Sequence, residues 1–157
     1  MNKFPMTVLG YEILQKELKK LINKERPNII AEIAEARGHG DLSENAEYQY
    51  AKEQQSLIEG KIIELESIIA QAEVIDVSKL SGEEIKFGAT IKIEDDETRE
   101  KSTYQIVGEY ESDIKNQKLS INSPLARGLI GKRKNDIVEI NSPKGAKIYS
   151  IISVLFK

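Results

Sequence analysis

The sequence predicts an α+β protein: an N-terminal antiparallel α-helical coiled-coil hairpin, followed by a small antiparallel β domain with one short helix. In residues 1–76 apolar side chains recur every three or four positions, as in amphipathic helices, whereas later segments alternate apolar and polar residues, as strands do. Charge divides at the same place. Residues 1–76 hold 9 Lys/Arg and 14 Asp/Glu, a formal charge of −5, and residues 77–157 hold 14 and 12, a charge of +2. We therefore expect two domains, 1–76 and 77–157.

The composition is typical of a soluble globular protein with a highly charged surface, since 39% of its 157 residues are hydrophobic and 31% charged. A net charge of −3 gives no basic field for direct binding of nucleic acid. The lack of cysteine excludes disulfides and thiolate metal sites. No apolar run has the length of a signal peptide or the ~20 residues of a membrane span. We expect a cytoplasmic protein without a membrane partner.

The first arm of the predicted hairpin covers residues 11–37. Pro27 interrupts its apolar pattern, and because an interior proline removes a backbone hydrogen bond we expect a kink or a break there. Gly38 and Gly40 then end the helix, as glycines past a helix terminus do. The apolar positions at helical spacing are Leu14, Leu18, Leu21, Ile22, Ile29, Ile30, Ile33 and Ala34.

The second arm runs from about residue 44 to 73 and has the more regular pattern. Steps of four and three residues relate its apolar positions, as in the seam of an antiparallel coiled coil. These positions are Ile58, Ile62, Leu65, Ile69 and Ala72. Two arms of about 30 residues would each be ~45 Å long.

The β domain is predicted from four alternating segments, residues 89–94, 103–108, 136–140 and 147–155. Turn residues separate them, at 95–97 and in Ser-Pro-Lys-Gly at 142–145. Ser123 followed by Pro124 is typical of a helix N-cap and first turn, so a short helix is expected from there to about residue 130.

Asp41 and Glu44 occupy the tip of the predicted hairpin, and two interpretations of them are open. The local one makes Asp41 the N-cap of the second arm, with Glu44 completing a capping box. The functional one makes them ligands of a cation at the end of a long rod. Mg²⁺ is usually held by one or two carboxylates together with waters and substrate phosphates. The remaining ligands would then come from a partner molecule.

Three long motifs resemble the bacterial transcript cleavage factors of the GreA/GreB family. The tip motif is Ile33-Ala-Glu-Ala-Arg-Gly-His-Gly-Asp-Leu-Ser-Glu-Asn-Ala-Glu-Tyr48. The others are Phe87-Gly-Ala-Thr90 and Asn122-Ser-Pro-Leu-Ala-Arg-Gly-Leu-Ile-Gly-Lys132. The resemblance covers essentially the whole chain without evident gaps, and it implies an FKBP-like C-terminal domain.

The resemblance also implies a mechanism. The hairpin would enter the secondary channel of backtracked bacterial RNA polymerase, and the polymerase itself would cleave the extruded 3′ end of the nascent RNA. Asp41 and Glu44 would serve as catalytic groups that hold Mg²⁺ jointly with the polymerase, with no cofactor bound by the factor alone. Ser43, Asn45 and Tyr48 would shape the tip. Arg37 and Lys52 would contact RNA phosphates, although a lysine lacks the bidentate fork of the arginine that is familiar at position 52.

By the same resemblance the C-terminal domain would dock at the rim of the channel, through Ile121, Ser123, Pro124 and Leu125. Simple packing under the short helix is the alternative for Ile121 and Leu125. The protein would be a monomer and no enzyme by itself. Two other functions are open: a channel-binding regulator that inhibits the polymerase without cleavage, and a prolyl isomerase, which the few aromatic residues of this domain disfavour.

His39, the single histidine, lies two residues before Asp41. A turn residue between two glycines is more typical of a tip-shaping or exposed side chain than of a general base.

Overall fold

A computed structural model describes residues 3–40 and 45–157. By its internal contacts the chain forms two compact units. The helical unit is Tyr11–Gln71, and the globular unit combines Met1–Gly10 with Ala72–Lys157. This division differs from the boundary expected at residue 76, because the N-terminal residues group with the C-terminal part of the chain.

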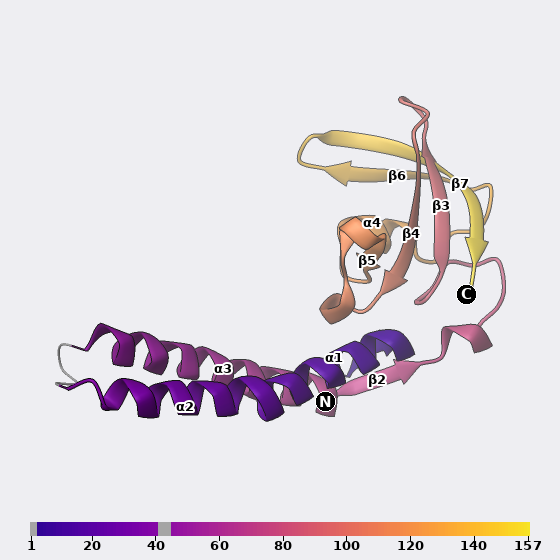
Figure 1. The fold of residues 1–157 in the computed structure, drawn as a ribbon. Helices are drawn as coiled ribbons and strands as arrows, with labels where there is room; N and C mark the ends of the chain where they lie inside the picture. The colour runs from indigo at the N-terminus through magenta and orange to yellow at the C-terminus, as the bar shows by residue number, and fades with distance from the viewer. Residues whose placement is uncertain (1–2, 41–44) are drawn as a thin grey trace. The chain divides into compact units, whose positions relative to one another are not determined.

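The expected α+β fold, with a helical hairpin followed by a sheet domain, is confirmed. The helical unit is a hairpin of two helical arms (Figure 1). The first arm consists of α1 (Val8–Lys20), the π-helical turn η1 (Leu21–Glu25) and α2 (Arg26–Arg37), and the second is α3 (Ala46–Ala70). Only the first three residues of α1 group with the globular unit.

The irregularity predicted around Pro27 is a π-helical turn and not a break. Pro27 lies in the first turn of α2, and helical residues continue on both sides of η1. Within this segment the N–H of Arg26 donates to the carbonyl of Leu21, five residues earlier. A proline ring clashes with the carbonyl four residues before it, which here is Asn23 inside the wider turn. The π turn accommodates the proline at the cost of local regularity.

The seam of the hairpin is narrow and differs in part from the predicted one. On α3, Ile62 and Leu65 are buried as expected, but Ile68 is buried where the pattern favoured Ile69, which is half-buried. The first arm buries Ala36, whereas Ile30 is 52% exposed. Near the tip one cluster joins both arms, composed of Ile29, Ile33 and Ala51 with Tyr48 and Ile58 against it.

An ion pair links the two arms beside the π turn. Arg26 donates from Nε and from one terminal nitrogen to the two carboxylate oxygens of Glu59, each at 2.8 Å. The two parallel hydrogen bonds of such a bidentate pair fix the relative orientation of the two side chains, in addition to the attraction between their charges. The hydrogen bonds from Arg26 hold the pKa of the Glu59 carboxyl below its ordinary value.

The globular unit contains a five-stranded sheet of order β5-β4-β3-β7-β6. Its strands pair antiparallel except for β4 and β5, which are parallel. The four predicted strands are present and β5 is additional, so the sheet is mixed at one edge. The strands are β3 (Thr90–Asp95), β4 (Lys101–Val107), β5 (Lys118–Ser120), β6 (Ile137–Ser142) and β7 (Gly145–Leu155).

The short helix α4 (Pro124–Leu129) begins and ends as the sequence predicts. The Ser123 hydroxyl accepts the N–H of Ala126 at 3.2 Å, and Gly131 follows the helix with φ +88°. Ala126 and Leu129 are fully buried against the sheet core, which includes Ile85, Ile91, Ile93, Ile106 and Ile151. The predicted hairpin turn is also present, because Ser142 pairs with Gly145 across β6 and β7.

A two-stranded parallel sheet, which sequence patterning missed, brings the N-terminus to the globular unit. It pairs β1 (Phe4–Thr7) with β2 (Ala72–Ile75). Three short 3₁₀ turns complete the unit: η2 (Val77–Lys79), η3 (Glu109–Glu111) and η4 (Ile114–Asn116). The carboxylate of Glu111 accepts from the Thr7 N–H at 3.0 Å, from the Thr7 hydroxyl at 2.8 Å and from the Gly108 N–H at 3.0 Å.

These contacts make Glu111 the anchor of β1. Replacement of Glu111 by Gln turns an amide NH₂ toward donors that need an acceptor, so we expect a loss of about 1–3 kcal/mol in the free energy of unfolding of the globular unit. Chemical unfolding, followed by NMR signals of the globular unit, measures it. Glu109→Gln, on an exposed neighbour, makes the same charge change and should leave the midpoint unchanged. Equal unfolding midpoints for Glu111→Gln and Glu109→Gln would show that the bonds from Glu111 do not stabilise β1.

The Arg26–Glu59 pair predicts a pH dependence. A carboxyl with a lowered pKa contributes stability above its ordinary pKa and loses that contribution as the pH falls through the lowered value. Wild type should therefore melt above Glu59→Gln at pH 7, and the difference should vanish at acidic pH. Circular dichroism at 222 nm measures both midpoints, with exposed Glu53→Gln as the charge-matched control. A difference in melting temperature between wild type and Glu59→Gln that grows as the pH falls would contradict this prediction.

Candidate functional site

At the end of the first arm, two backbone hydrogen bonds join residues three apart and close the helix. Gly38 donates to the carbonyl of Glu35 at 3.0 Å, and His39 donates to that of Ala36 at 3.2 Å. Gly40 has φ +115°, a conformation that side chains rarely adopt. The glycines thus end the helix as predicted.

Three of the predicted site residues follow directly. Asp41, Ser43 and Glu44 lie outside the described residues, in the segment 41–44. Their roles as metal ligands and tip residues stay predictions.

The chain is described again from Asn45, which is the N-cap of α3. Its Oδ1 accepts the N–H of Tyr48 at 3.1 Å. The interpretation of Asp41 as the N-cap of this helix is therefore wrong, because α3 begins at Ala46 and its cap position is filled. The signal was in the sequence, since an asparagine followed by an acidic residue in the first turn, here Glu47, also fits a helix start.

Asn45 also reaches the other arm. Its Nδ2 donates to the carbonyl of Ala36 at 2.6 Å. The Ala36 carbonyl also accepts the N–H of His39 at 3.2 Å, so Asn45 supplies a second donor to this acceptor at the end of α2.

Tyr48 and Arg37 face each other across the tip. Tyr48 is half-buried against Ile29, Ile33 and Ala51, and the guanidinium carbon of Arg37 lies 5.9 Å from the centroid of its ring. This is the range of a cation–π contact, which leaves the guanidinium donors available to an anion. Lys52 is exposed one turn further along α3, where its Nζ donates to Oε1 of Gln55 at 3.0 Å.

The charged groups around the tip are exposed. His39 Nδ1 lies 3.8 Å from a Glu47 carboxylate oxygen, with the two side chains 53% and 74% exposed. A pocket of about 230 Å³ nearby is lined by Glu32, Glu35, Ala36, Glu47, Tyr50 and Ala51. Outside residues 1–2 and 41–44, no group of three or more His, Cys, Asp or Glu is arranged to hold a metal ion.

Three of the four predicted docking residues of the globular unit line one pocket. Ser123, Pro124 and Leu125 line a mostly apolar pocket of about 350 Å³ between α4 and the β6–β7 hairpin. Ile121 does not line it and packs against the sheet core, while Leu125 does both, and the docking role of the four residues stays a prediction. The other lining residues are Ile140, Asn141, Ser142, Pro143, Lys144, Lys147 and Tyr149.

Sequence reasoning missed Lys144 and Lys147, both exposed at this pocket. The turn at 142–145 was predictable, but its position beside α4 follows from the strand order and from no local pattern.

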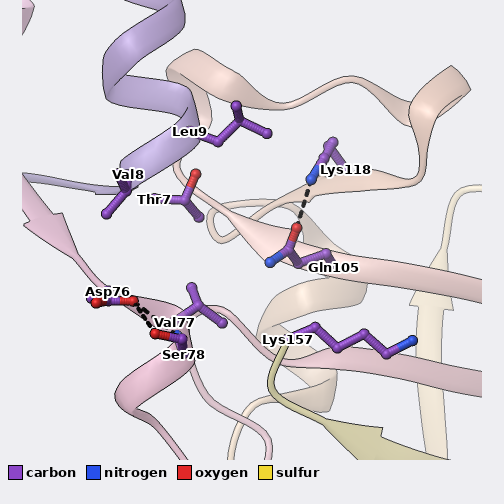
Figure 2. A pocket seen from close by; sticks show the side chains of 9 residues that line it. All are labelled: Thr7, Val8, Leu9, Asp76, Val77, Ser78, Gln105, Lys118 and Lys157. Carbon is purple, nitrogen blue, oxygen red and sulfur yellow. Dashed lines mark hydrogen bonds between the residues drawn. The ribbon is translucent and has the colours of Figure 1, made fainter.

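A second pocket, of about 240 Å³, lies in the globular unit, and hydrogen bonds between side chains account for most of its polar lining (Figure 2). Four of its polar lining residues bond to each other in pairs: Lys118 Nζ donates to Gln105 Oε1 at 2.6 Å, and Asp76 accepts from the hydroxyl and N–H of Ser78 at 2.6 and 3.0 Å. The bonds from Ser78 hold the pKa of Asp76 below its ordinary value. The pocket lies where the start of α1, η2 and the sheet come together.

Comparison with known proteins agrees with the fold. The family model "Transcription elongation factor, N-terminal" matches residues 4–74, and "Transcription elongation factor, GreA/GreB, C-term" matches residues 80–156. Transcription elongation factor GreA of Bartonella tribocorum is 60% identical over 156 residues, covering 99% of both chains. GreA of Chelativorans sp. is 58% identical, with the same coverage.

Among solved structures, GreA factor homolog 1 of Thermus thermophilus aligns at 25% identity with a TM-score of 0.45, covering 98% of this chain and 99% of that one. No helix in the described ranges is long and apolar enough to cross a bilayer. Two family models in series and relatives of 58–60% identity across the full length lead to one assignment. This chain belongs to the GreA/GreB family of transcription elongation factors.

Proposed function

We propose that this protein inserts its helical hairpin into the secondary channel of backtracked bacterial RNA polymerase and stimulates the polymerase's own cleavage of the nascent RNA 3′ end, so that elongation resumes. One observation carries the proposal. Asn45 fills the N-cap position of α3, so capping of that helix no longer accounts for Asp41. Neither Asp41 nor Glu44 is the N-cap of α3, so the capping-box interpretation of this pair is replaced by the role that the family resemblance implies.

Asp41 and Glu44 have the donor chemistry that Mg²⁺ prefers, but they supply only two of its six oxygen ligands. The polymerase and the RNA would supply the others, so the factor binds no metal alone. When bound, the ion would stabilise charge on the reacting phosphodiester. The chain's own contribution is to bring the two carboxylates to the reaction, which makes it a non-enzymatic factor.

The groups beside the acids suit an RNA phosphate. Arg37 presents its guanidinium over the Tyr48 ring, and a guanidinium can donate two parallel hydrogen bonds to a phosphate. Lys52, exposed on α3, adds a point charge. These two cations offset the repulsion between the RNA and an otherwise acidic hairpin.

The pocket beside α4 supports a second contact, with the rim of the channel. Pro124, Leu125 and Ile140 provide apolar lining, and Lys144 and Lys147 add positive charge. A partner segment with an apolar side chain flanked by acidic residues fits this chemistry. The factor would act in the cytoplasm as a monomer.

The alternative is a regulator that occupies the channel and inhibits the polymerase without cleavage. The Asp-Leu-Ser-Glu tip disfavours it, because a blocking factor does not need two carboxylates at this spacing. Prolyl isomerase activity is disfavoured by the lining of the α4 pocket, where Tyr149 is the one aromatic residue among the described lining groups.

Asp41→Asn and Glu44→Gln should each abolish cleavage while binding persists. Each removes the charge of a metal ligand at nearly constant shape, so we expect the cleavage rate at saturating factor to fall about 10²-fold or more, with the affinity for the polymerase within a few-fold. The measurement is release of labelled 3′ fragments from a backtracked elongation complex. Wild-type rates for Asp41→Asn would refute the metal assignment. Inhibition by wild type without fragment release would favour the blocking regulator.

Lys144→Glu with Lys147→Glu should produce the opposite pattern. Reversal of both charges at the α4 pocket weakens docking but leaves the tip intact, so the factor concentration for half-maximal cleavage should rise about tenfold at an unchanged maximal rate. Titration of the factor in the same assay measures both values. Lys134→Glu, exposed on the same unit and outside the pocket, is the matched control. A loss shared equally with this control contradicts a specific docking role.

A further inference from the structure

We propose that Tyr50 and Leu57 form a docking face on α3 for a basic segment of the polymerase, and that the pocket beside Tyr50 receives an arginine side chain of that segment. This inference rests on the proposed function, because it names a partner for the side of α3 that faces away from Lys52. The face lies within the helical unit and consists of described residues.

Two large apolar side chains are exposed on one side of α3. Tyr50 is 62% exposed and Leu57 is 66% exposed. Because an α-helix has 3.6 residues per turn, side chains seven positions apart lie on the same side of it, about 10 Å from each other along the axis. A tyrosine that a partner can bury is among the side chains that contribute most to protein interfaces, and the leucine extends its apolar surface.

A pocket of about 230 Å³ lies beside Tyr50, between α2 and α3, which run side by side (Figure 1). Ala36 and Ala51 contribute methyl groups to its lining, and they are only 4% and 3% exposed. Small side chains at these two positions leave room for one long side chain from another molecule. The remaining lining residues are Glu32, Glu35, Glu47 and Tyr50.

The charge of this pocket selects a cation as its occupant. Glu32 and Glu35 are exposed, and neither carboxylate forms an ion pair with another described residue. Glu47 lies 3.8 Å from Nδ1 of His39, an imidazole that is charged only when it is protonated. A partner segment that carries positive charge therefore complements this side of the hairpin.

Arginine is the side chain that matches the whole lining. A guanidinium donates paired hydrogen bonds to carboxylates and stacks on aromatic rings, and its methylene stem packs on apolar surface. The pocket offers the carboxylates of Glu32 and Glu35, the exposed ring of Tyr50 and the two alanine methyl groups. A lysine has the charge and the stem but lacks the planar fork. RNA is disfavoured as the occupant, because its phosphates are repelled by these acids.

The docking face and the cation proposed to meet the RNA point in different directions. Tyr50 and Lys52 are two positions apart, which places their side chains about 160° from each other around the axis of α3. A segment held by Tyr50 and Leu57 would therefore leave Lys52 accessible to the RNA. The contact would determine which side of the hairpin faces the reaction, and a modest affinity is enough for that.

The first experiment measures the Kd of the whole factor for a purified backtracked elongation complex. The chain has no cysteine, so a dye on Glu97→Cys, in an exposed turn, reports binding by anisotropy. Tyr50→Ala and Leu57→Ala should each raise the Kd about fivefold, because each removes apolar surface that the partner buries. The maximal cleavage rate at saturating factor should stay at the wild-type value.

Ile63→Ala is the matched control for Leu57→Ala. Ile63 is also on α3 and is 69% exposed, but it lies about 120° away from Leu57 around the helix. Its replacement removes a similar apolar surface and should change the Kd by no more than about twofold.

The second experiment tests the charge of the pocket. Glu32→Gln with Glu35→Gln should raise the Kd about tenfold at low salt, and the Kd should then depend less steeply on ionic strength, because a screened attraction is lost. Glu12→Gln with Glu53→Gln removes the same charge at exposed positions outside the pocket and is the control. A merely structural role of Glu32 and Glu35 would lower the melting temperature without changing the salt dependence.

A photocrosslinker identifies the occupant. With p-benzoylphenylalanine in place of Leu57, we expect a crosslink to a polymerase segment that contains arginine or lysine. A crosslink only to RNA, or to a polymerase segment without a basic residue, would overturn the inference. So would a dimer of the free factor that Leu57→Ala abolishes, because the face would then bind a second copy.

The affinities decide the inference independently of cleavage. Wild-type Kd values for Tyr50→Ala, Leu57→Ala and the Glu32/Glu35 variant would refute it, as would equal losses in the matched controls. If the wild-type factor binds the complex but releases no RNA fragment, the proposed function fails, while the Kd values still decide whether this face docks.

Discussion

The hydrogen bond from Asn45 to the carbonyl of Ala36 is the contact on which the tip depends. Two antiparallel helices end there, and each presents unpaired backbone groups: carbonyls from α2 and N–H groups from α3. One amide side chain satisfies a group of each kind. The other described contacts between the arms at this end are the cluster around Ile33 and Ala51, Arg37 over the Tyr48 ring, and His39 beside Glu47. The end of α2 and the start of α3 are thus joined by polar bonds as well as by burial.

The hairpin has little apolar surface with which to hold itself together. Several large apolar side chains of the arms, among them Ile13, Ile30, Leu57 and Ile63, are more than half exposed, so polar contacts also contribute to the register of the arms. The bidentate pair of Arg26 and Glu59 does this beside the π turn, and Asn45 does it at the tip. Pro27 lies between these two places and excludes a regular hydrogen bond at its own position. Register in this unit is therefore set at discrete polar contacts.

The sequence was sufficient for the features that are periodic or local. The two arms, four strands of the sheet, the Ser123 cap and the turn at 142–145 follow from spacing and turn chemistry. The missed features are short or non-local. β1 and β2 have four residues each, too few for a period to appear, and their pairing joins residues about 68 apart. The spacing of Asp41 and Glu44 fits a capping box and predicts a cap at Asp41, whereas α3 begins at Ala46 and the Asn45 side chain accepts the N–H of Tyr48.

Charge gives the two parts of the chain different tasks. Residues 1–76 carry −5, so under the proposed function the tip would gain little affinity for RNA phosphates from its own field, and Arg37 and Lys52 would have to offset the repulsion. Binding energy has to come from elsewhere. The apolar pocket beside α4, with Lys144 and Lys147 on it, has the chemistry to supply that energy. Tight binding by the tip would also slow its departure once the RNA is cut. In the proposed function, a weakly binding acidic tip with affinity supplied by a separate surface would suit a factor that has to leave the channel after cleavage.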